Sequence, residues 1–409
     1  MSFRTSNSEY GRFYYDQIQK QVKEDQEKKR NQSNQYNNSS TNYSSNYHQN
    51  KKNTTNNRPK HSLLYDSSIV GNITNSLTGL QNLGNTCFMN TCLQNLIHCT
   101  PFISQFLEIS NQMFQKNIRP CPISDSFYEL LLKIYENNNN DQNDYINPTN
   151  FVDSFCSLHN QFFGNREHDT QEFCRFLLQD INCELNEVVS PSGYKENMPK
   201  QHKEEMFYNY KKYCLSKENS IITNLFIGYF SFEYICECGF KEYSFSQFLD
   251  LPVQMSSGIN GYDLFQMLQN NFYRKSFVDM GEVCSFCKRT SKKNEIMRIA
   301  SLPQILIISL QRINRHNGNK NSAPVRFYEG LDLREIMDAQ LSDGSSTKYD
   351  LFAVSNHVGQ INSGHYFSYI KIGKSWYCFE DSKVFKVGYQ IEMTSTEVYT
   401  LFYTRNNSR

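Results

Sequence analysis

The sequence predicts an α+β fold in which helices fill the first half of the globular part and strands fill the second. Between residues 79 and 190, apolar residues recur at i, i+3 and i+4 in several segments, as on amphipathic helices. Beyond residue 224 the segments are rich in aromatic and β-branched residues, which is typical of strands. The 409 residues suffice for one large domain or two ordinary ones.

The charge balance and the apolar runs exclude several classes of protein. The formal net charge is +1, so no global electrostatic attraction to nucleic acid or to a membrane surface is expected. The longest apolar run, Ile305 to Leu310, is far shorter than a membrane span and fits a buried strand. The first 20 residues contain no apolar core of a secretory signal.

The cysteine content indicates a reducing compartment. The chain has 13 cysteines, an odd number, and no export signal, so we expect reduced thiols in the cytoplasm or nucleus. Some of these thiols should then be catalytic or bind metal, and the others should be buried.

Residues 1–75 are expected to form a disordered tail. The segment 31–57 is dominated by Asn, Ser, Tyr, Lys and Thr, and it cannot bury enough apolar surface to offset chain entropy. Tyrosines in an Asn-rich background are compatible with self-association, but we prefer the interpretation of a solvated tail. The globular part is expected from Gly79 onward.

The stretch from Gly79 to Cys99 contains the first candidate for chemistry. Thr86 can cap a helix that begins at Cys87, and free backbone N–H groups and the helix dipole there favour a thiolate. Cys87 is therefore a candidate nucleophile, and the side-chain amide of Asn82 is a candidate oxyanion donor. The alternative is a buried structural cysteine, which is our interpretation of Cys92 and Cys99.

Further helices are expected along the first half of the chain. A second spans Ser126 to Tyr135 and is followed by an asparagine tract, Asn137 to Asn140, expected to be a loop. A third spans Asn150 to Phe163, and a fourth follows Asp169, which is suited to cap it. Residues 190 to about 220 are polar and are expected to form a surface insertion.

Two pairs of cysteines in turn-like segments suggest a structural zinc site. Cys284 and Cys287 have the C-x-x-C spacing of a zinc knuckle, while Cys236 and Cys238 form a C-x-C pair that is one residue shorter. The alternative is four loop cysteines without metal. We favour zinc, because four thiolates in a reducing compartment rarely cluster by accident.

The last third of the chain should be a β-sheet that carries a histidine and a carboxylate. The expected strands are Ile305–Ile313, Tyr349–Ser355, His365–Ile372, Trp376–Phe379 and Val398–Thr404. A two-residue turn at Gly373-Lys374 places Glu380 on the sheet face of His365, whereas a three-residue turn places Asp381 there. Either register brings a carboxylate near His365, as a nucleophile–base–carboxylate site requires. His357 is a rival base that we regard as a loop or supporting residue.

Several boxes of this sequence resemble those of the ubiquitin-specific processing proteases, in the same order. They are GLQNLGNTCFMNTCLQ, HDTQEFCRFLLQDI, SLPQILIISLQRI, and NHVGQINSGHYFSYIK with WYCFEDSKV. The resemblance extends from about Gly79 to Arg405. It departs from the family pattern at Glu380, where Asp or Asn is usual, at the C-x-C pair, and at Gln311 and Ile313, where Lys and Phe are common.

The resemblance implies a papain-like cysteine protease fold with a helical thumb, a β-sheet palm and zinc-ribbon-like β fingers. The catalytic domain would span residues 79–405, with fingers at about 225–300. The resemblance assigns the nucleophile, base, oxyanion donor and third triad position to Cys87, His365, Asn82 and Glu380, with Asp381 in the next, also acidic, position. It places Asp169 against the basic tail of ubiquitin, and Gly364 at the end of a loop, Gly359 to Gly364, that borders the tail channel.

The expected function is therefore a deubiquitinating thiol hydrolase that cleaves the bond after the C-terminal glycine of ubiquitin. Its partners would be ubiquitin and ubiquitinated proteins, and catalysis would need no cofactor. Two alternatives keep the fold: a non-catalytic ubiquitin-binding scaffold, in which the longer Glu380 misplaces the imidazole, and a protease for a ubiquitin-like modifier.

Overall fold

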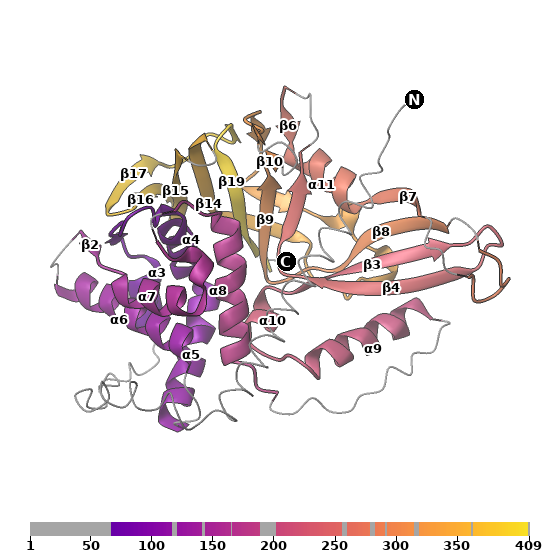
Figure 1. The fold of residues 1–409 in the computed structure, drawn as a ribbon, viewed down its shortest axis with the longest axis horizontal. Coiled ribbons are helices and arrows are strands. Elements are labelled where there is room, and N and C mark those ends of the chain that lie inside the picture. The colour runs from indigo at the N-terminus through magenta and orange to yellow at the C-terminus, as the bar shows by residue number, and fades with distance from the viewer. Residues whose placement is uncertain are drawn as a thin grey trace.

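The computed structural model shows helices at one end of the molecule, a large sheet in the middle and long strands at the other end (Figure 1). It describes residues 67–116, 121–140, 144–164, 166–188, 202–255, 260–278, 283–290, 293–314, 319–360 and 363–407. The predicted division into a helical first half and a stranded second half is confirmed.

The thumb is a group of helices built around α4 (Cys87–Ile97). Every residue of α4 is buried, because the helix packs between α8 (Thr170–Glu184) and the central sheet. The other helices of this part are α3 (Ser67–Thr74), α5 (Thr100–Lys116), α6 (Pro122–Asn140), α7 (Thr149–Leu158) and α10 (Ile221–Leu225). Pro101 lies in the first turn of α5, where its missing N–H is not needed.

Two expectations about the borders of the thumb are wrong. Residues 67–74 form helix α3 instead of part of a disordered tail, because Ile69, Val70 and Ile73 are buried in the thumb core. The asparagine tract is not a loop but the last turn of α6. Asn138 bonds to Asn72 of α3, so these amides join two helices. Residues 1–66 of the expected tail lie outside the described part of the chain.

The palm is an eight-stranded sheet in the order β17-β16-β15-β14-β19-β9-β5, with β13 also paired to β14. Its members are β5 (Leu251–Gln254), β9 (Ile305–Gln311), β13 (Gly330–Asp332), β14 (Lys348–Gln360), β15 (Ser363–Ile372), β16 (Ser375–Glu380), β17 (Lys383–Gly388) and β19 (Val398–Arg405). All five strands predicted for the last third of the chain are present, with bounds shifted by a few residues. Thumb and palm share one core cluster, which includes Cys87 and Ile370.

The fingers are a four-stranded antiparallel sheet that extends away from the palm (Figure 1). Its order is β4 (Lys241–Phe248), β3 (Gly228–Ile235), β8 (Lys293–Ser301) and β7 (Arg274–Val278). Part of the expected polar insertion, residues 203–215, forms helix α9 (Lys203–Leu215). The helix is fixed to the fingers because its buried Lys203 lies 3.7 Å from the carboxylate of Glu233 on β3, and it also binds Asp338.

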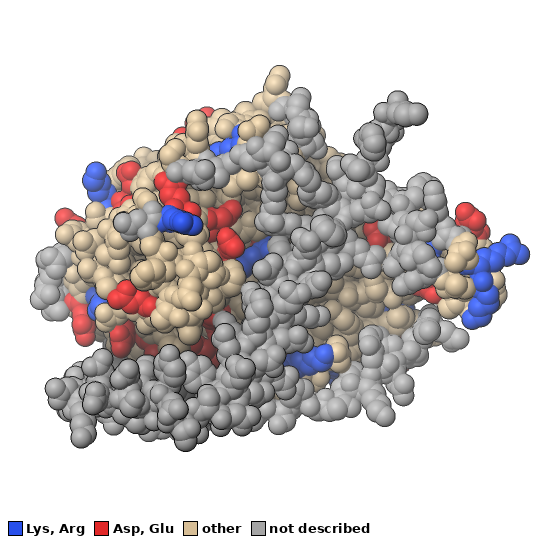
Figure 2. All heavy atoms as spheres, viewed as in Figure 1, with Lys and Arg blue, Asp and Glu red and all other residues tan. Residues whose placement is uncertain are grey.

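Small strands and one helix complete the structure. β1 (Gly79–Leu80) pairs with β2 (Tyr145–Ile146) at the thumb (Figure 1). The others are β6 (Tyr262–Asp263), α11 (Leu264–Phe272), β10 (Ile313–Asn314), β11 (Asn319–Lys320), β12 (Val325–Arg326) and β18 (Thr394–Ser395). None of the helices in the described ranges has the length and apolarity needed to cross a bilayer. On the face drawn in Figure 2, acidic side chains gather over the thumb and the palm, and basic ones at the far end of the fingers.

Candidate active site

The loop before α4 is organised by the side chain of Asn82. Its Oδ1 accepts from the backbone N–H groups of Gly84, at 2.9 Å, and Thr86, at 3.2 Å. Asn85 has a φ of 54°, in the left-handed region that asparagine tolerates better than most residues. Thr86 is the N-cap residue, but its hydroxyl accepts from Leu83 N–H instead of capping the helix. The loop therefore delivers Cys87 to the first position of α4.

Cys87 is more buried than the sequence suggests. Only 4% of the residue is exposed. Burial raises the pKa of the Cys87 thiol above its usual value; the charges of Asp381 and Glu167 add to the rise, and the backbone N–H groups of Tyr366 and Phe88 oppose it. The N–H group of Phe88 at the helix start favours the thiolate, as expected, but burial outweighs it, and in this conformation the sulfur is a thiol.

His365 lies on β15, the strand that packs on the helix beginning with Cys87. The β15–β16 hairpin pairs Ile372 with Ser375, so its loop is the two residues Gly373-Lys374. In this register Glu380 shares the sheet face of His365, and its Oε1 lies 3.4 Å from Nε2 of the imidazole. The geometry therefore brings Glu380, and not Asp381, to the histidine.

Asp381 turns away from the histidine and contacts the cysteine loop. It has a φ of 51° in the tight turn between β16 and β17, which breaks the alternation of side chains along the strand. Its two carboxylate oxygens accept from the amides of Asn82, at 2.9 Å, and Asn90, at 2.8 Å. The Asn82 amide nitrogen carries two N–H groups, so one remains after the bond to Asp381.

Glu167 and Asp169, which lie just before α8, connect the thumb to strands of the palm. The carboxylate of Glu167, before α8, accepts from Gly364 N–H at 2.8 Å. Asp169 caps α8 by accepting from Gln171 N–H at 2.8 Å, and it also accepts from the hydroxyl of Tyr399. Asp169 is therefore a helix cap, as expected, and also a bridge from the thumb to β19.

The contacts of His357 make it unsuited to act as the catalytic base. Nδ1 of its ring lies 2.8 Å from Nζ of Lys320, and the ring packs on Tyr366 with 4.4 Å between ring centroids. Burial lowers the pKa of His357 to about 4, with Lys320, His365 and Arg312 adding to the effect. At neutral pH its imidazole is neutral, and one of its two nitrogens is already engaged.

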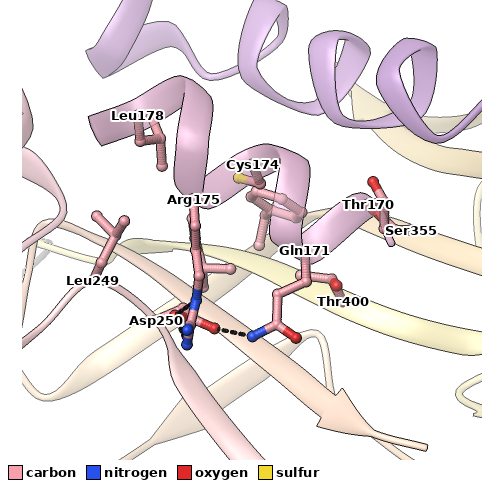
Figure 3. A pocket seen from close by; sticks show the side chains of 11 residues that line it. Thr170, Gln171, Cys174, Arg175, Leu178, Leu249, Asp250, Ser355 and Thr400 are labelled. Atoms are coloured by element: carbon pink, nitrogen blue, oxygen red, sulfur yellow. Dashed lines mark hydrogen bonds and ion pairs between the residues drawn. The ribbon is translucent and has the colours of Figure 1, made fainter. Parts of the chain in front are cut away.

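A small cavity lies beneath α8, between the thumb and the palm (Figure 3). On its wall Asp250 accepts from Gln171 at 2.7 Å, from Arg175 at 2.7 Å and from Ser309 at 2.9 Å. These bonds pair the charge of Asp250, as a buried carboxylate requires. The cavity is therefore part of the polar joint between α8 and the sheet.

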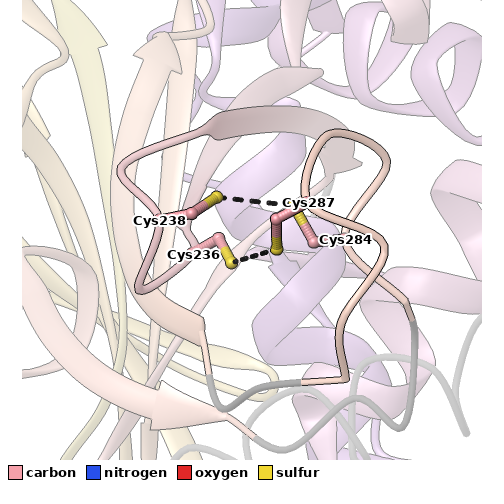
Figure 4. A group of neighbouring side chains, drawn as sticks. All are labelled: Cys236, Cys238, Cys284 and Cys287. Atoms are coloured by element: carbon pink, nitrogen blue, oxygen red, sulfur yellow. Dashed lines mark hydrogen bonds between the residues drawn. The ribbon is translucent and has the colours of Figure 1, made fainter.

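The four cysteines predicted to bind zinc meet at the outer end of the fingers (Figure 4). The Sγ atoms of Cys236 and Cys287 are 3.8 Å apart, as are those of Cys238 and Cys284, and all four lie within 4.8 Å of one another. A disulfide would need an S–S distance of about 2.05 Å, so these are separate thiols. The short C-x-C pair reaches the cluster because Gly239, at φ 84°, closes its turn.

Four residues that the sequence did not single out take part in this arrangement: Asn90, Glu167, Lys320 and Tyr399. Asn90 gave a signal, since it lies one turn after Cys87 on the polar side of that helix, together with Thr91 and Gln94. The others gave none, because their partners are distant in sequence: 197 residues separate Glu167 from Gly364.

The helical thumb, the sheet palm and the cysteine that opens a helix against a histidine-bearing strand define a papain-like cysteine protease fold. A sequence model described as "Ubiquitin carboxyl-terminal hydrolase" matches residues 78–403. The chain therefore belongs to the ubiquitin carboxyl-terminal hydrolase family, whose members are cysteine proteases that remove ubiquitin. The resemblance seen in the sequence is confirmed.

Two curated relatives illustrate the extent of the similarity. Ubiquitin carboxyl-terminal hydrolase 2 of Gallus gallus is 30% identical over 348 residues, covering 81% of this chain and 94% of that protein. Its Bos taurus counterpart is 29% identical over 341 residues, which are 80% of this chain and 55% of that protein. This chain therefore spans about half the length of the bovine relative.

A solved structure with the same fold is the SAGA DUB module that contains Ubp8, bound to monoubiquitin. It matches with a TM-score of 0.65 and 22% identity, covering 83% of this chain and 71% of that chain. At this identity the likeness bears on the fold, and it agrees with the hand-shaped arrangement of thumb, palm and fingers.

Proposed function

We propose that this chain is a deubiquitinating thiol hydrolase that cleaves the peptide or isopeptide bond after the C-terminal glycine of ubiquitin. His365 takes the proton of the Cys87 thiol as the sulfur attacks the glycine carbonyl. Asn82 donates to the oxyanion. The proton then passes to the leaving amine as the C–N bond breaks, and water hydrolyses the remaining thioester.

One observation carries this proposal: α4 places Cys87 against β15, where Glu380 lies 3.4 Å from His365. The three groups come from segments almost 300 residues apart, and a fold without this chemistry has no need to assemble them. Asp381 supports the arrangement by binding Asn82, so each of the two adjacent carboxylates has a separate partner.

The test is reaction with a ubiquitin probe that carries a C-terminal electrophile, followed by intact-mass measurement. The expected result is a single adduct that Cys87→Ala abolishes and Cys92→Ser retains. Cys92 is the matched control, because it lies on the same helix and is also buried. A folded wild-type chain that forms no adduct would contradict the proposal.

The second candidate is a non-catalytic ubiquitin-binding scaffold, and two observations favour it. The Cys87 thiol has a raised pKa, and Nε2 of His365 has no hydrogen-bond partner among the described residues. We prefer the enzyme, because the tail of ubiquitin must pass close to these groups and both can shift when it binds. A Cys87→Ala chain that binds ubiquitin, beside a wild type that forms no adduct, would identify a scaffold.

Ubiquitin is the proposed substrate because acidic side chains lie near Cys87. The carboxylates of Glu167 and Asp381 are close enough to raise the pKa of the Cys87 thiol, and they would attract a basic tail that ends in two glycines. At Gly364, a Cβ atom would meet Nε2 of His357 at 2.0 Å, so the chain is already in close contact on that side. The probe for a ubiquitin-like modifier, used in parallel, discriminates the third possibility.

A structural zinc ion in the fingers is part of the same proposal. Four sulfurs at Zn–S distances of about 2.3 Å in a tetrahedron lie roughly 3.8 Å apart, and two of the observed sulfur separations have this value. The two 3.8 Å distances are those from Cys236 to Cys287 and from Cys238 to Cys284, each between one cysteine pair and the other. The residues thus fit the metal, and they would hold it far from Cys87. Metal analysis of the purified protein tests this.

Two further expectations follow from the free thiols and the position of the core. Four clustered thiols need a reducing environment to stay free, which supports a location in the cytoplasm or the nucleus.

The catalytic domain is proposed to begin at Ser67, since α3 belongs to its core, and to end near Arg405.

A further inference from the structure

Lys320 is a partly buried lysine whose three N–H donors all bind atoms near the end of β14. It lies on β11, which pairs with β10 in a short two-stranded sheet. Its Nζ lies 2.8 Å from Nδ1 of His357, and it donates to the carbonyl oxygen of His357 at 2.8 Å and to that of Gly359 at 3.0 Å. An ammonium group has three donors and no acceptor, so its capacity is used in full.

The strand end that Lys320 holds lies opposite the proposed base. Between the two carbonyls bound by the ammonium stands Val358, which pairs with His365 in the β14–β15 ladder. Gly359 pairs in the same way with Gly364. The lysine therefore binds β14 on both sides of Val358, the residue that pairs with His365.

The same contact fixes the state of His357. The Lys320 ammonium cannot accept a hydrogen bond, so Nδ1 of His357 must accept, and the proton of the neutral ring is on Nε2. That nitrogen lies against Gly364, where even a Cβ atom has no room. The ring therefore presses on the residue that precedes His365.

We propose that Lys320 is a positioning residue for the reaction: it fixes the end of β14, and through the pairing of β14 with β15 it holds His365 in line with Cys87. The proposal rests on the hydrolase function argued above. It adds a residue, outside the group that touches the substrate, on which the rate depends.

The surroundings of Lys320 make this contact sensitive to pH. Burial lowers the pKa of Lys320 to about 8, and Arg312 adds to the effect, while Glu397 opposes it. The other charged or titratable group facing it is His357, which is neutral at this pH. Below pH 8 the lysine keeps three donors; above it one is lost, so the grip on β14 weakens as the pH rises.

The experiment is a pH profile of kcat and KM on a fluorogenic ubiquitin amide for wild type, Lys320→Arg and Lys320→Met. In wild type, kcat should decline above pH 8. Arginine keeps its charge throughout, so Lys320→Arg should move this decline to higher pH. Lys320→Met should lower kcat about 10-fold or more at pH 7.5, because small misplacements of a catalytic group are costly.

Binding separates positioning from general damage. Ubiquitin affinity, measured with Cys87→Ala in the background, should change less than about 2-fold in Lys320→Met. The matched control is Lys371→Met, which removes a lysine of β15 that binds Glu329 at 3.1 Å, and it should keep wild-type kinetics.

The inference is overturned if Lys320→Met keeps wild-type kcat, or if the alkaline decline of Lys320→Arg coincides with that of wild type. Should the methionine variant unfold, the profile of the arginine variant decides. If wild type itself neither cleaves the substrate nor labels with the ubiquitin probe, it is the proposed function that fails.

Discussion

The cleft between thumb and palm and the outer end of the fingers both hold cysteines, but they are built in opposite ways. In the cleft, Cys87 is buried and its neighbours come from segments far apart in sequence: Asp381, almost 300 residues on, binds Asn82 and Asn90. At the fingers, four thiols sit on two short turns at the exposed end of a sheet, with Lys288 and Arg289 at the surface.

This difference separates what each region contributes. The cleft is a polar network inside a shared core, so a change of one atom there alters the geometry of the chemistry. The four thiols come from two short turns, and none of them belongs to the three hydrophobic core clusters of the described residues. We therefore expect cleft variants to lose kcat and finger variants to lose binding.

The largest effect is expected from Cys87 itself. Cys87→Ser should lower kcat by at least about 10⁴-fold and leave ubiquitin affinity intact, because oxygen is a poorer nucleophile of similar size. The control Cys92→Ser should keep kcat and cost about 1–2 kcal/mol in the free energy of unfolding, since the residue is 1% exposed. Equal losses of kcat in both folded variants would contradict the assignment.

The adjacent carboxylates should differ in the size of their effect. Glu380→Gln removes the charge that faces His365 and should cost up to about 10⁴-fold in kcat. Asp381→Asn disturbs the amide of Asn82 and should cost about 10²-fold, as loss of an oxyanion donor does. Both variants are nearly isosteric, and kcat at neutral pH is the measurement.

The order of these two losses is what matters. A larger loss in Asp381→Asn would reverse the assignment of the orienting carboxylate. Little loss in either variant would mean that Cys87 and His365 act as a dyad. Asn90→Ala is a third arm: Asn90 shares Asp381 with Asn82, so its effect should follow that of Asp381→Asn.

A moderate effect is expected from the fingers. Metal removal with a chelator, or Cys287→Ser, should raise KM for a ubiquitin substrate about 10-fold and change kcat less than about 3-fold, as loss of uniform binding does. Metal content is measured on the same samples. A metal-free preparation with an unchanged KM would end the zinc proposal.

The sequence anticipates much of this arrangement, because its signals are local. The helix at Cys87 and the two-residue turn at Gly373-Lys374 follow from periodicity and turn chemistry, and the turn fixes the register that brings Glu380 to His365. The raised pKa of the Cys87 thiol was not predictable, because it depends on burial by β15 and on charges from distant segments. The role of Lys320 was not predictable either, because its partner His357 lies 37 residues further along the chain.

At residues 67–75 the sequence prediction was wrong: composition predicted disorder, whereas residues 67–74 form a helix. This segment follows a polar tract and looks too short to fold, yet Ile73 of α3 is fully buried against the thumb helices. Tertiary packing stabilises a helix of eight residues that would not form alone. The domain therefore begins earlier than composition suggests.

The smallest effect on activity is expected at this border, and two truncations locate it. Deletion of residues 1–66 keeps α3 and every other described element, so we expect kcat on a ubiquitin amide and the melting temperature both to stay within error of the full chain. Deletion of residues 1–74 removes α3 and should lower the melting temperature, because Ile69, Val70 and Ile73 lose their burial in the thumb.

The point variant Ile73→Ala separates the loss of packing from the loss of chain. Truncation of a fully buried isoleucine should cost about 2–5 kcal/mol in the free energy of unfolding. In the fraction that stays folded, kcat should be that of wild type, because the main packing partners of α3 are α5 and α6. A fall in kcat after deletion of residues 1–66, in a chain that melts normally, would show that the tail contributes to catalysis and that Ser67 is not the start of the functional unit.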